Sequence, residues 1–285
     1  MLVLIVSLLS SLLVGFYIKY LKIRHIKNLF VMVFANYMVA IILCYSLFDI
    51  KLSMVTLNKS SIIFISALGF LMPSIFFVLN QSLKYSGLAK TDIFQRMSLI
   101  IPVALSFTLF NEQFTLSKFL VIILAFISIV LLLYKKSTKN GNFNIVYLLA
   151  VFVGYGIVDT LFKMVALNKD LPYITVLFYI FIVCALISAV YLMIFRGTIN
   201  KKYVLSGVVL GLLNFTNIYF YLKAHKIFSD SPTLVFITMN LGVIIGGCLI
   251  GRIFFKEHLS KNTIIGVVLA IISVILLALI QLNKI

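Results

Sequence analysis

The chain has 285 residues, of which 63% are hydrophobic and 11% are charged, and its mean hydropathy is +1.21. A soluble domain carries about a quarter charged residues, so this composition excludes an ordinary soluble enzyme and predicts an all-α membrane protein with many spans. The net charge of +17 does not indicate nucleic-acid binding, because the Lys and Arg residues lie in short segments between apolar runs.

Apolar runs of bilayer-spanning length follow one another along the whole chain. About 20 apolar residues are needed for a helix to cross the hydrocarbon core, and the sequence predicts ten such spans. The first run begins at Met1 without preceding basic residues or a following cleavage site, so we expect it to remain as a span. The expected spans are residues 1–20, 29–48, 61–82, 91–110, 116–134, 144–166, 173–195, 203–224, 232–254 and 262–282.

The basic residues of the connections predict an orientation. Connections that follow odd-numbered spans hold fifteen Lys or Arg residues, and the opposite side holds seven. Cytoplasmic loops carry the excess of basic residues. We therefore expect a multi-pass protein of the cytoplasmic (inner) membrane with both termini on the extracytoplasmic side.

The fourth expected span, residues 91–110, combines an apolar body with polar residues in its first turns. Asp92, Gln95 and Arg96 precede Pro102, which removes one backbone hydrogen bond from the middle of the span. Ionisable residues within a span usually face a partner or a wet cavity. Two interpretations stay open: Asp92 and Arg96 form an intrahelical ion pair, or Arg96 binds an anionic group such as a carboxylate.

Two acidic residues, Glu112 and Glu257, end spans 4 and 9 at short turns. The N-terminus of a helix favours negative charge. We expect each carboxylate to accept hydrogen bonds from the first amides of the helix that follows it, rather than to couple transport to an ion.

The sixth span carries Asp159 and Lys163, again four residues apart, after Tyr155 and its flanking glycines. Burial favours the protonated form of a carboxylate, which would suit Asp159 to proton coupling with Lys163 as its neighbour. The alternative is a lysine at the end of the helix with no part in transport.

The chain repeats itself at about half its length. A shift of 142 residues aligns spans 3 and 4 with spans 8 and 9, and a shift of 145 aligns span 5 with span 10. We expect two five-span repeats, residues 1–139 and 140–285, which must cross the membrane in opposite senses because five is odd. The aligned pairs include Gly69 and Gly211, Thr91 and Thr233, Phe94 and Phe236, Met97 and Met239, Glu112 and Glu257, Ala125 and Ala270, Ser128 and Ser273, and Leu132 and Leu277.

Three asparagines lie in counterpart spans, Asn80 in the third and Asn214 and Asn217 in the eighth. Polar side chains in membrane helices often form hydrogen bonds between helices, worth about 0.6 kcal/mol each. Because spans 3 and 8 occupy equivalent positions in the two repeats, a shared polar cavity is the other interpretation.

Ten spans in two halves, each with an acidic residue closing its fourth span, resemble the drug/metabolite transporter superfamily, in its EamA-like branch. The resemblance covers the whole chain, and its motifs are characteristic of an architecture rather than a substrate. It implies export or exchange of small metabolites through a central cavity, without a cofactor. The segments that carry it are Leu83–Ser86, span 4 with Pro102, Phe110–Thr115 and Phe255–Ser260.

The sequence thus favours a secondary transporter for a small polar metabolite, an amino acid or related solute, working by alternating access among membrane lipids. A flippase for a lipid or lipid-linked sugar on the same fold is the alternative. An enzyme is disfavoured, because no loop offers a Ser/His/Asp set or paired carboxylates, and no metal site is expected, because the cysteines lack histidines at ligand spacing. Monomer and homodimer both stay open.

Overall fold

The computed structural model describes residues 2–23, 29–48, 50, 58–133, 144–168, 171–195, 199–254 and 260–281, and these form helices without any strand. The helices lie close to the expected spans, with one exception around residue 98. They are α1 (Leu2–Ile23), α2 (Leu29–Leu47), α3 (Lys59–Met97), α4 (Ile100–Thr108), α5 (Leu116–Leu133), α6 (Ile145–Leu167), α7 (Tyr173–Ile194), α8 (Lys201–Ile227), α9 (Pro232–Phe254) and α10 (Lys261–Gln281).

Within the described residues, eight helices are long and apolar enough to cross a bilayer. These are α2, the Lys59–Gly87 part of α3, and α5 to α10. The apolar part of α1, Leu2–Ile18, is shorter, and α4 has only nine residues. The chain is therefore an all-helical polytopic membrane protein.

The expected fourth span is not one continuous helix. Its first part is the end of α3, beyond a break at Gly87, whose φ of 78° and ψ of 168° are not helical. Its second part is α4, and a turn at Ser98 and Leu99 separates the two. The sequence predicted a span over 91–110 that Pro102 interrupts, and the structure places the interruption at Ser98 and Leu99.

Proline chemistry explains the break after Ser98. Pro102 has no amide hydrogen, so it cannot donate to the Ser98 carbonyl as the helical pattern requires. The amide of Ile101 donates to that carbonyl instead, at 3.0 Å, which tightens the turn. The Ser98 hydroxyl donates to the carbonyl of Gln95 at 2.6 Å and satisfies another backbone group at the break.

The chain forms two compact units, and each contains helices from both halves of the sequence. One comprises Met1–Ser74 and Leu161–Lys226, and the other comprises Ile75–Thr160 and Ile227–Ile285. The helices α3 and α6 therefore contribute to both units. Helices five apart in chain order pack together: α2 with α7 in the first unit, and α5 with α10 and α4 with α9 in the second.

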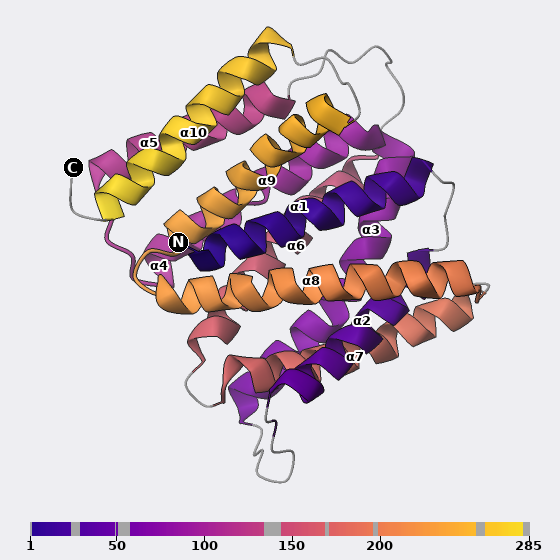
Figure 1. Cartoon of the computed structure of the whole chain (residues 1–285). Coiled ribbons are helices and arrows are strands. Elements are labelled where there is room, and N and C mark those ends of the chain that lie inside the picture. Colours follow the sequence, from indigo (N-terminus) through magenta and orange to yellow (C-terminus); the bar gives the residue numbers. More distant parts are fainter. Residues whose placement is uncertain are drawn as a thin grey trace. The chain divides into compact units, whose positions relative to one another are not determined.

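In the first unit, α2 and α7 run antiparallel along each other (Figure 1). Phe30 near the start of α2 stacks on Phe195 just after the end of α7, with ring centroids 4.7 Å apart. Tyr45 near the end of α2 contacts Phe178 near the start of α7, at 6.5 Å.

Glycines allow close helix contacts in the first unit. A Cβ on Gly211 of α8 would lie 2.8 Å from both the carbonyl oxygen of Asn36 and Cβ of Val39 in α2. A Cβ on Gly69 of α3 would lie 2.5 Å from Cγ1 of Val183 in α7. Both glycines are needed at helix crossings where no side chain fits.

In the second unit, α5 and α10 also run antiparallel (Figure 1). Gly266 near the start of α10 faces Leu132 near the end of α5, and a Cβ there would lie 2.8 Å from Leu132 Cγ. The repeat-matched positions on both helices are buried in this unit: Ala125, Ser128 and Leu132 on α5, and Ala270, Ser273 and Leu277 on α10.

Replacing Gly87 with Ala is expected to destabilise the protein. The backbone region of Gly87 is essentially restricted to glycine, and a side chain there costs about 1–3 kcal/mol. The Gly247→Ala control places its methyl in open space on α9, so helix propensity leaves it neutral or slightly stabilising. Unfolding in detergent would measure the stability of both variants. Equal stability would refute the claim that the backbone conformation of Gly87 requires glycine.

Candidate functional site

Four of the predicted site residues come together in the second unit. The charge of Arg96 interacts with Asp92, one turn earlier on α3, and with Tyr155 and Asp159 on α6. All four side chains are half-buried. The predicted pair of Asp92 and Arg96 is thus part of a larger polar cluster, in which the charge of one arginine is within electrostatic reach of two acidic residues and a phenol.

Two glycines bring α6 close to the helices that carry this cluster. A Cβ on Gly156 would lie 2.5 Å from Cδ1 of Ile101 in α4, and Gly154 lies directly against Ile75 of α3. These glycines flank Tyr155. Because α6 carries no side chain where Ile75 and Ile101 pack against it, Tyr155 and Asp159 are held close to the broken fourth span.

Two other predicted residues of this unit, Asn80 and Gln95, differ in exposure. Asn80 on α3 is exposed, and the side chain of Gln95 is half-buried. The backbone carbonyl of Gln95 serves the helix break, as the acceptor of the Ser98 hydroxyl.

The predicted asparagines of α8 form hydrogen bonds between helices of the first unit. Nδ2 of Asn214 donates to Oδ1 of Asn36 in α2 at 3.3 Å. Oδ1 of Asn217 accepts from the hydroxyl of Ser7 in α1 at 2.9 Å. Both contacts have the geometry that the interhelical interpretation predicts. The partners Asn36 and Ser7 are polar residues in apolar runs, which was the one signal that could have singled them out.

Lys163 is fully buried in the first unit. Its Nζ donates to the backbone carbonyl of His225 in the last turn of α8, at 3.1 Å. A positive charge is favourable at the C-terminus of a helix. Lys163 therefore stabilises the end of α8, and it does so from the protein interior rather than from a solvated helix end.

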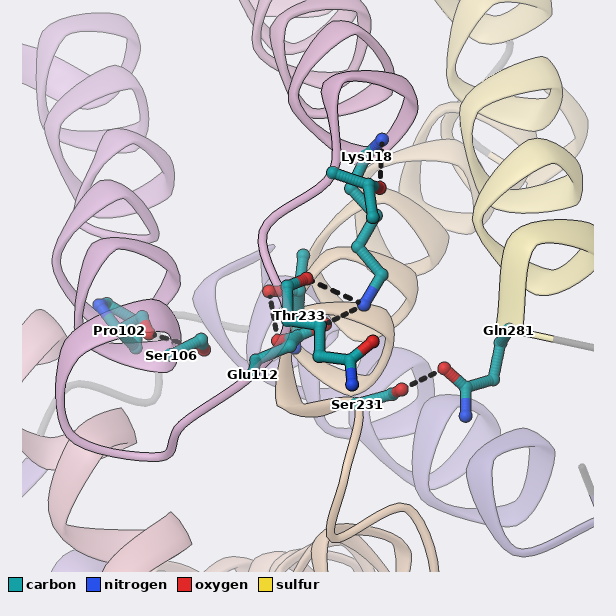
Figure 2. Close-up of polar contacts among 9 residues, drawn as sticks. Pro102, Ser106, Glu112, Lys118, Ser231, Thr233 and Gln281 are labelled. Atoms are coloured by element: carbon teal, nitrogen blue, oxygen red, sulfur yellow. Dashed lines mark hydrogen bonds and ion pairs between the residues drawn. The ribbon is translucent and has the colours of Figure 1, made fainter. Parts of the chain in front are cut away.

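Glu112 does act at the N-terminus of a helix, but the predicted helix was wrong. Its Oε2 accepts hydrogen bonds from the amide of Thr233, at 3.0 Å, and from the Thr233 hydroxyl, at 2.6 Å (Figure 2). Thr233 is in the first turn of α9, not in the following helix α5. Oε1 of Glu112 forms an ion pair with Lys118 at 3.3 Å.

Local residues explain why Glu112 serves α9. The helix α5 has its own cap, because the amide of Lys118 donates to the hydroxyl of Thr115 at 3.3 Å. Ser231, directly before α9, instead contacts Oε1 of Gln281 in α10 (Figure 2). The start of α9 thus takes its acceptor from 121 residues earlier in the chain. Glu257, the repeat counterpart of Glu112, lies outside the described residues.

No group of three or more His, Cys, Asp or Glu residues that could hold a metal ion occurs in the part of the chain that the structure describes. The chemistry of the cluster is that of charge and hydrogen bonding. An arginine can bind a carboxylate through two parallel hydrogen bonds, and a carboxylate of Asp92 or Asp159 can bind an ammonium group.

Known proteins resemble this chain along most of its length. The sequence model of the EamA-like transporter family matches the chain twice, at residues 1–134 and 142–279. An uncharacterized protein of Haemophilus influenzae is 37% identical over 262 residues, 88% of this chain and 89% of that protein. An S-adenosylmethionine uptake transporter of Rickettsia prowazekii is 25% identical over 172 residues, 60% of this chain and 56% of that transporter. A crystal structure aligns with a TM-score of 0.72 at 14% identity, covering 98% of this chain and 96% of its own, a likeness of fold alone.

Removing the Glu112 carboxylate is expected to destabilise the start of α9. Glu112→Ala should lower the free energy of unfolding by about 1.5–3 kcal/mol, the usual size for hydrogen bonds to a charged group. Thr233→Val loses one of the two bonds, so its loss should be smaller, and the double variant should lose less than the sum. Denaturant unfolding would measure all three against Gln113→Ala, an exposed neighbour. If the double variant lost the sum of the two single losses in free energy of unfolding, the contact between Glu112 and Thr233 would be contradicted.

Proposed function

The chain belongs to the EamA-like transporter family, and from this premise we propose that it moves a small polar metabolite across the cell membrane by alternating access. The solute is an amino acid or a related compound, and the direction is export or exchange. The observation that carries this proposal is the cluster in which Arg96 interacts with Asp92, Tyr155 and Asp159 at the broken fourth span.

The packing of counterpart helices supports an inverted repeat of residues 1–139 and 140–285. The pairs α2 with α7 and α5 with α10 run antiparallel, as a second repeat of opposite sense requires. The glycine contacts also correspond: Gly69 on α3 faces Val183 on α7, and its counterpart Gly211 on α8 faces Val39 on α2. Such a repeat provides two equivalent half-structures, the construction on which alternating access depends in many secondary transporters.

The charges of the Arg96 cluster favour a zwitterionic solute. Arg96 offers a site for a carboxylate, and two acidic residues leave one carboxylate in excess to bind an ammonium group. The relative that takes up S-adenosylmethionine supports this class, because that compound carries the carboxylate and amino group of an amino acid. Tyr155 supplies a hydroxyl for the same solute.

Asp159 is the proposed coupling residue. A membrane-embedded carboxylate that interacts with the charge of an arginine can bind a proton or a cationic solute group, and acidic residues form proton relays in many pumps and transporters. Lys163, the neighbour that the sequence suggested for such a role, donates to a backbone carbonyl at the end of α8, so we assign it to helix stabilisation.

A ligand screen by thermal shift tests the binding role of Arg96. We expect S-adenosylmethionine or an amino acid to raise the melting temperature of the purified protein, because a ligand that binds only the folded state stabilises it. Arg96→Ala should weaken binding by about tenfold to a hundredfold, and Arg96→Lys should restore little, because lysine lacks the planar fork. Arg252→Ala, at the exposed end of α9, is the matched control.

The panel of compounds also includes nucleobases, sugars, phosphorylated metabolites and lipid-linked sugars. Equal affinities in wild type and both Arg96 variants would remove Arg96 from the binding site. Stabilisation by lipid-linked sugars alone would establish the flippase in place of the metabolite transporter.

The proposed orientation has its own test. A reporter fused after Ile285 should give an extracytoplasmic signal, because the excess of basic residues follows the odd-numbered spans. A reporter placed in the connection at residues 134–143 should give the opposite signal. A cytoplasmic C-terminus would overturn the orientation.

A further inference from the structure

A buried hydroxyl on α9 has no hydrogen-bond partner among the described residues. Oγ1 of Thr238 is shielded from solvent and contacts no donor or acceptor there. Buried polar groups are almost always paired, and leaving one unpaired is costly. An unpaired group in a native fold therefore calls for an explanation, and a bound solute or water can supply the missing hydrogen bond.

Other threonines of the same chain form a hydrogen bond within their own helix that Thr238 does not form. The hydroxyl of Thr160 donates to the carbonyl of Gly156 at 2.8 Å, and that of Thr216 donates to the carbonyl of Leu212 at 2.8 Å. This bond to the residue four positions earlier is the usual solution for a hydroxyl within a helix. The hydroxyl of Thr238 does not donate to the equivalent carbonyl, that of Leu234.

The sequence repeat makes Thr238 the counterpart of Arg96. The shift of 142 residues that aligns Phe94 with Phe236 and Met97 with Met239 also aligns Arg96 with Thr238. Arg96 and Thr238 both belong to the second compact unit. In transporters with inverted repeats, the equivalent helices of both repeats contribute to one solute site.

Two glycines follow Thr238 on one face of α9. Gly242 and Gly246 follow at intervals of four residues, which places all three positions on one face of the helix. Gly242 and Gly246 therefore place no side chain beside Thr238 on its C-terminal side.

We propose that the Thr238 hydroxyl is a solute-binding group, the second-repeat counterpart of Arg96. It hydrogen-bonds the amino-acid portion of the solute, and this contact satisfies a hydroxyl that the empty protein leaves unpaired. The proposal rests on the proposed function, because it assumes that Arg96 marks the solute site.

The test compares three variants in purified full-length protein with S-adenosylmethionine as the probe, and in parallel with each amino acid of the panel. Thr238→Val keeps the shape and removes the hydroxyl, and we expect it to raise the Kd about threefold to tenfold. Thr238→Ser keeps the hydroxyl and should bind nearly as wild type. Thr160→Val removes a hydroxyl that is bonded within its own helix and should leave the Kd unchanged.

Melting temperature without solute is a second readout. Thr238→Val should melt at or above the wild-type temperature, because it removes an unpaired buried hydroxyl at constant shape. A lower melting temperature than that of Thr160→Val would mean that the hydroxyl is bonded in the empty protein, and would overturn the proposal.

The outcomes separate this proposal from the proposed function. Weaker binding in Arg96→Ala with an unchanged Kd in Thr238→Val would refute only the role of Thr238. Failure of the wild type to bind S-adenosylmethionine and every other compound of the panel would overturn both.

Discussion

Backbone groups at helix ends and helix breaks within a membrane must find partners inside the protein, and this constraint organises much of the chain. Thr115, Asn144, Asn200 and Ser260 each accept a hydrogen bond from an amide at the start of the helix that they precede. For α9 the acceptor is the distant Glu112, which thereby ties the end of the α4 segment to the start of α9. Lys163 serves the opposite end of α8 with the opposite charge.

The same constraint explains how the Arg96 cluster is placed. Pro102 interrupts the fourth span, and the chain restores its hydrogen bonds by a turn at Ser98 rather than by a continuous helix. Arg96 therefore lies at the end of one helical segment, two residues before the turn at Ser98. Glycines on α6 then bring Tyr155 and Asp159 to the charge of Arg96. The polar site thus lies at a helix break where the carbonyls of Ser98 and Gln95 keep hydrogen-bond donors.

Much of this arrangement follows from the sequence, and the exceptions have physical reasons. Hydropathy predicts helix positions well because a bilayer imposes one length and one pattern on every span, so α2, α5, α7 and α10 lie within two residues of expectation. The break after Ser98 depends on which amide donates to the Ser98 carbonyl in place of Pro102, a local choice that composition does not encode. The partner of Glu112 was missed because it lies 121 residues away, beyond any local capping pattern. The cluster of Arg96 with Asp159 required the close contact at Gly156, which a single sequence does not reveal.

The central claim is that Arg96 anchors an amino-acid-like solute that the protein exchanges across the membrane. Counterflow in proteoliposomes tests this most directly: vesicles loaded with unlabelled solute are diluted into labelled S-adenosylmethionine or a labelled amino acid. The account predicts transient accumulation of at least one of these labels by the wild type and by Arg252→Ala, and none by Arg96→Ala at equal protein content. Equal accumulation by Arg96→Ala, or none by the wild type with any of these compounds, would contradict it.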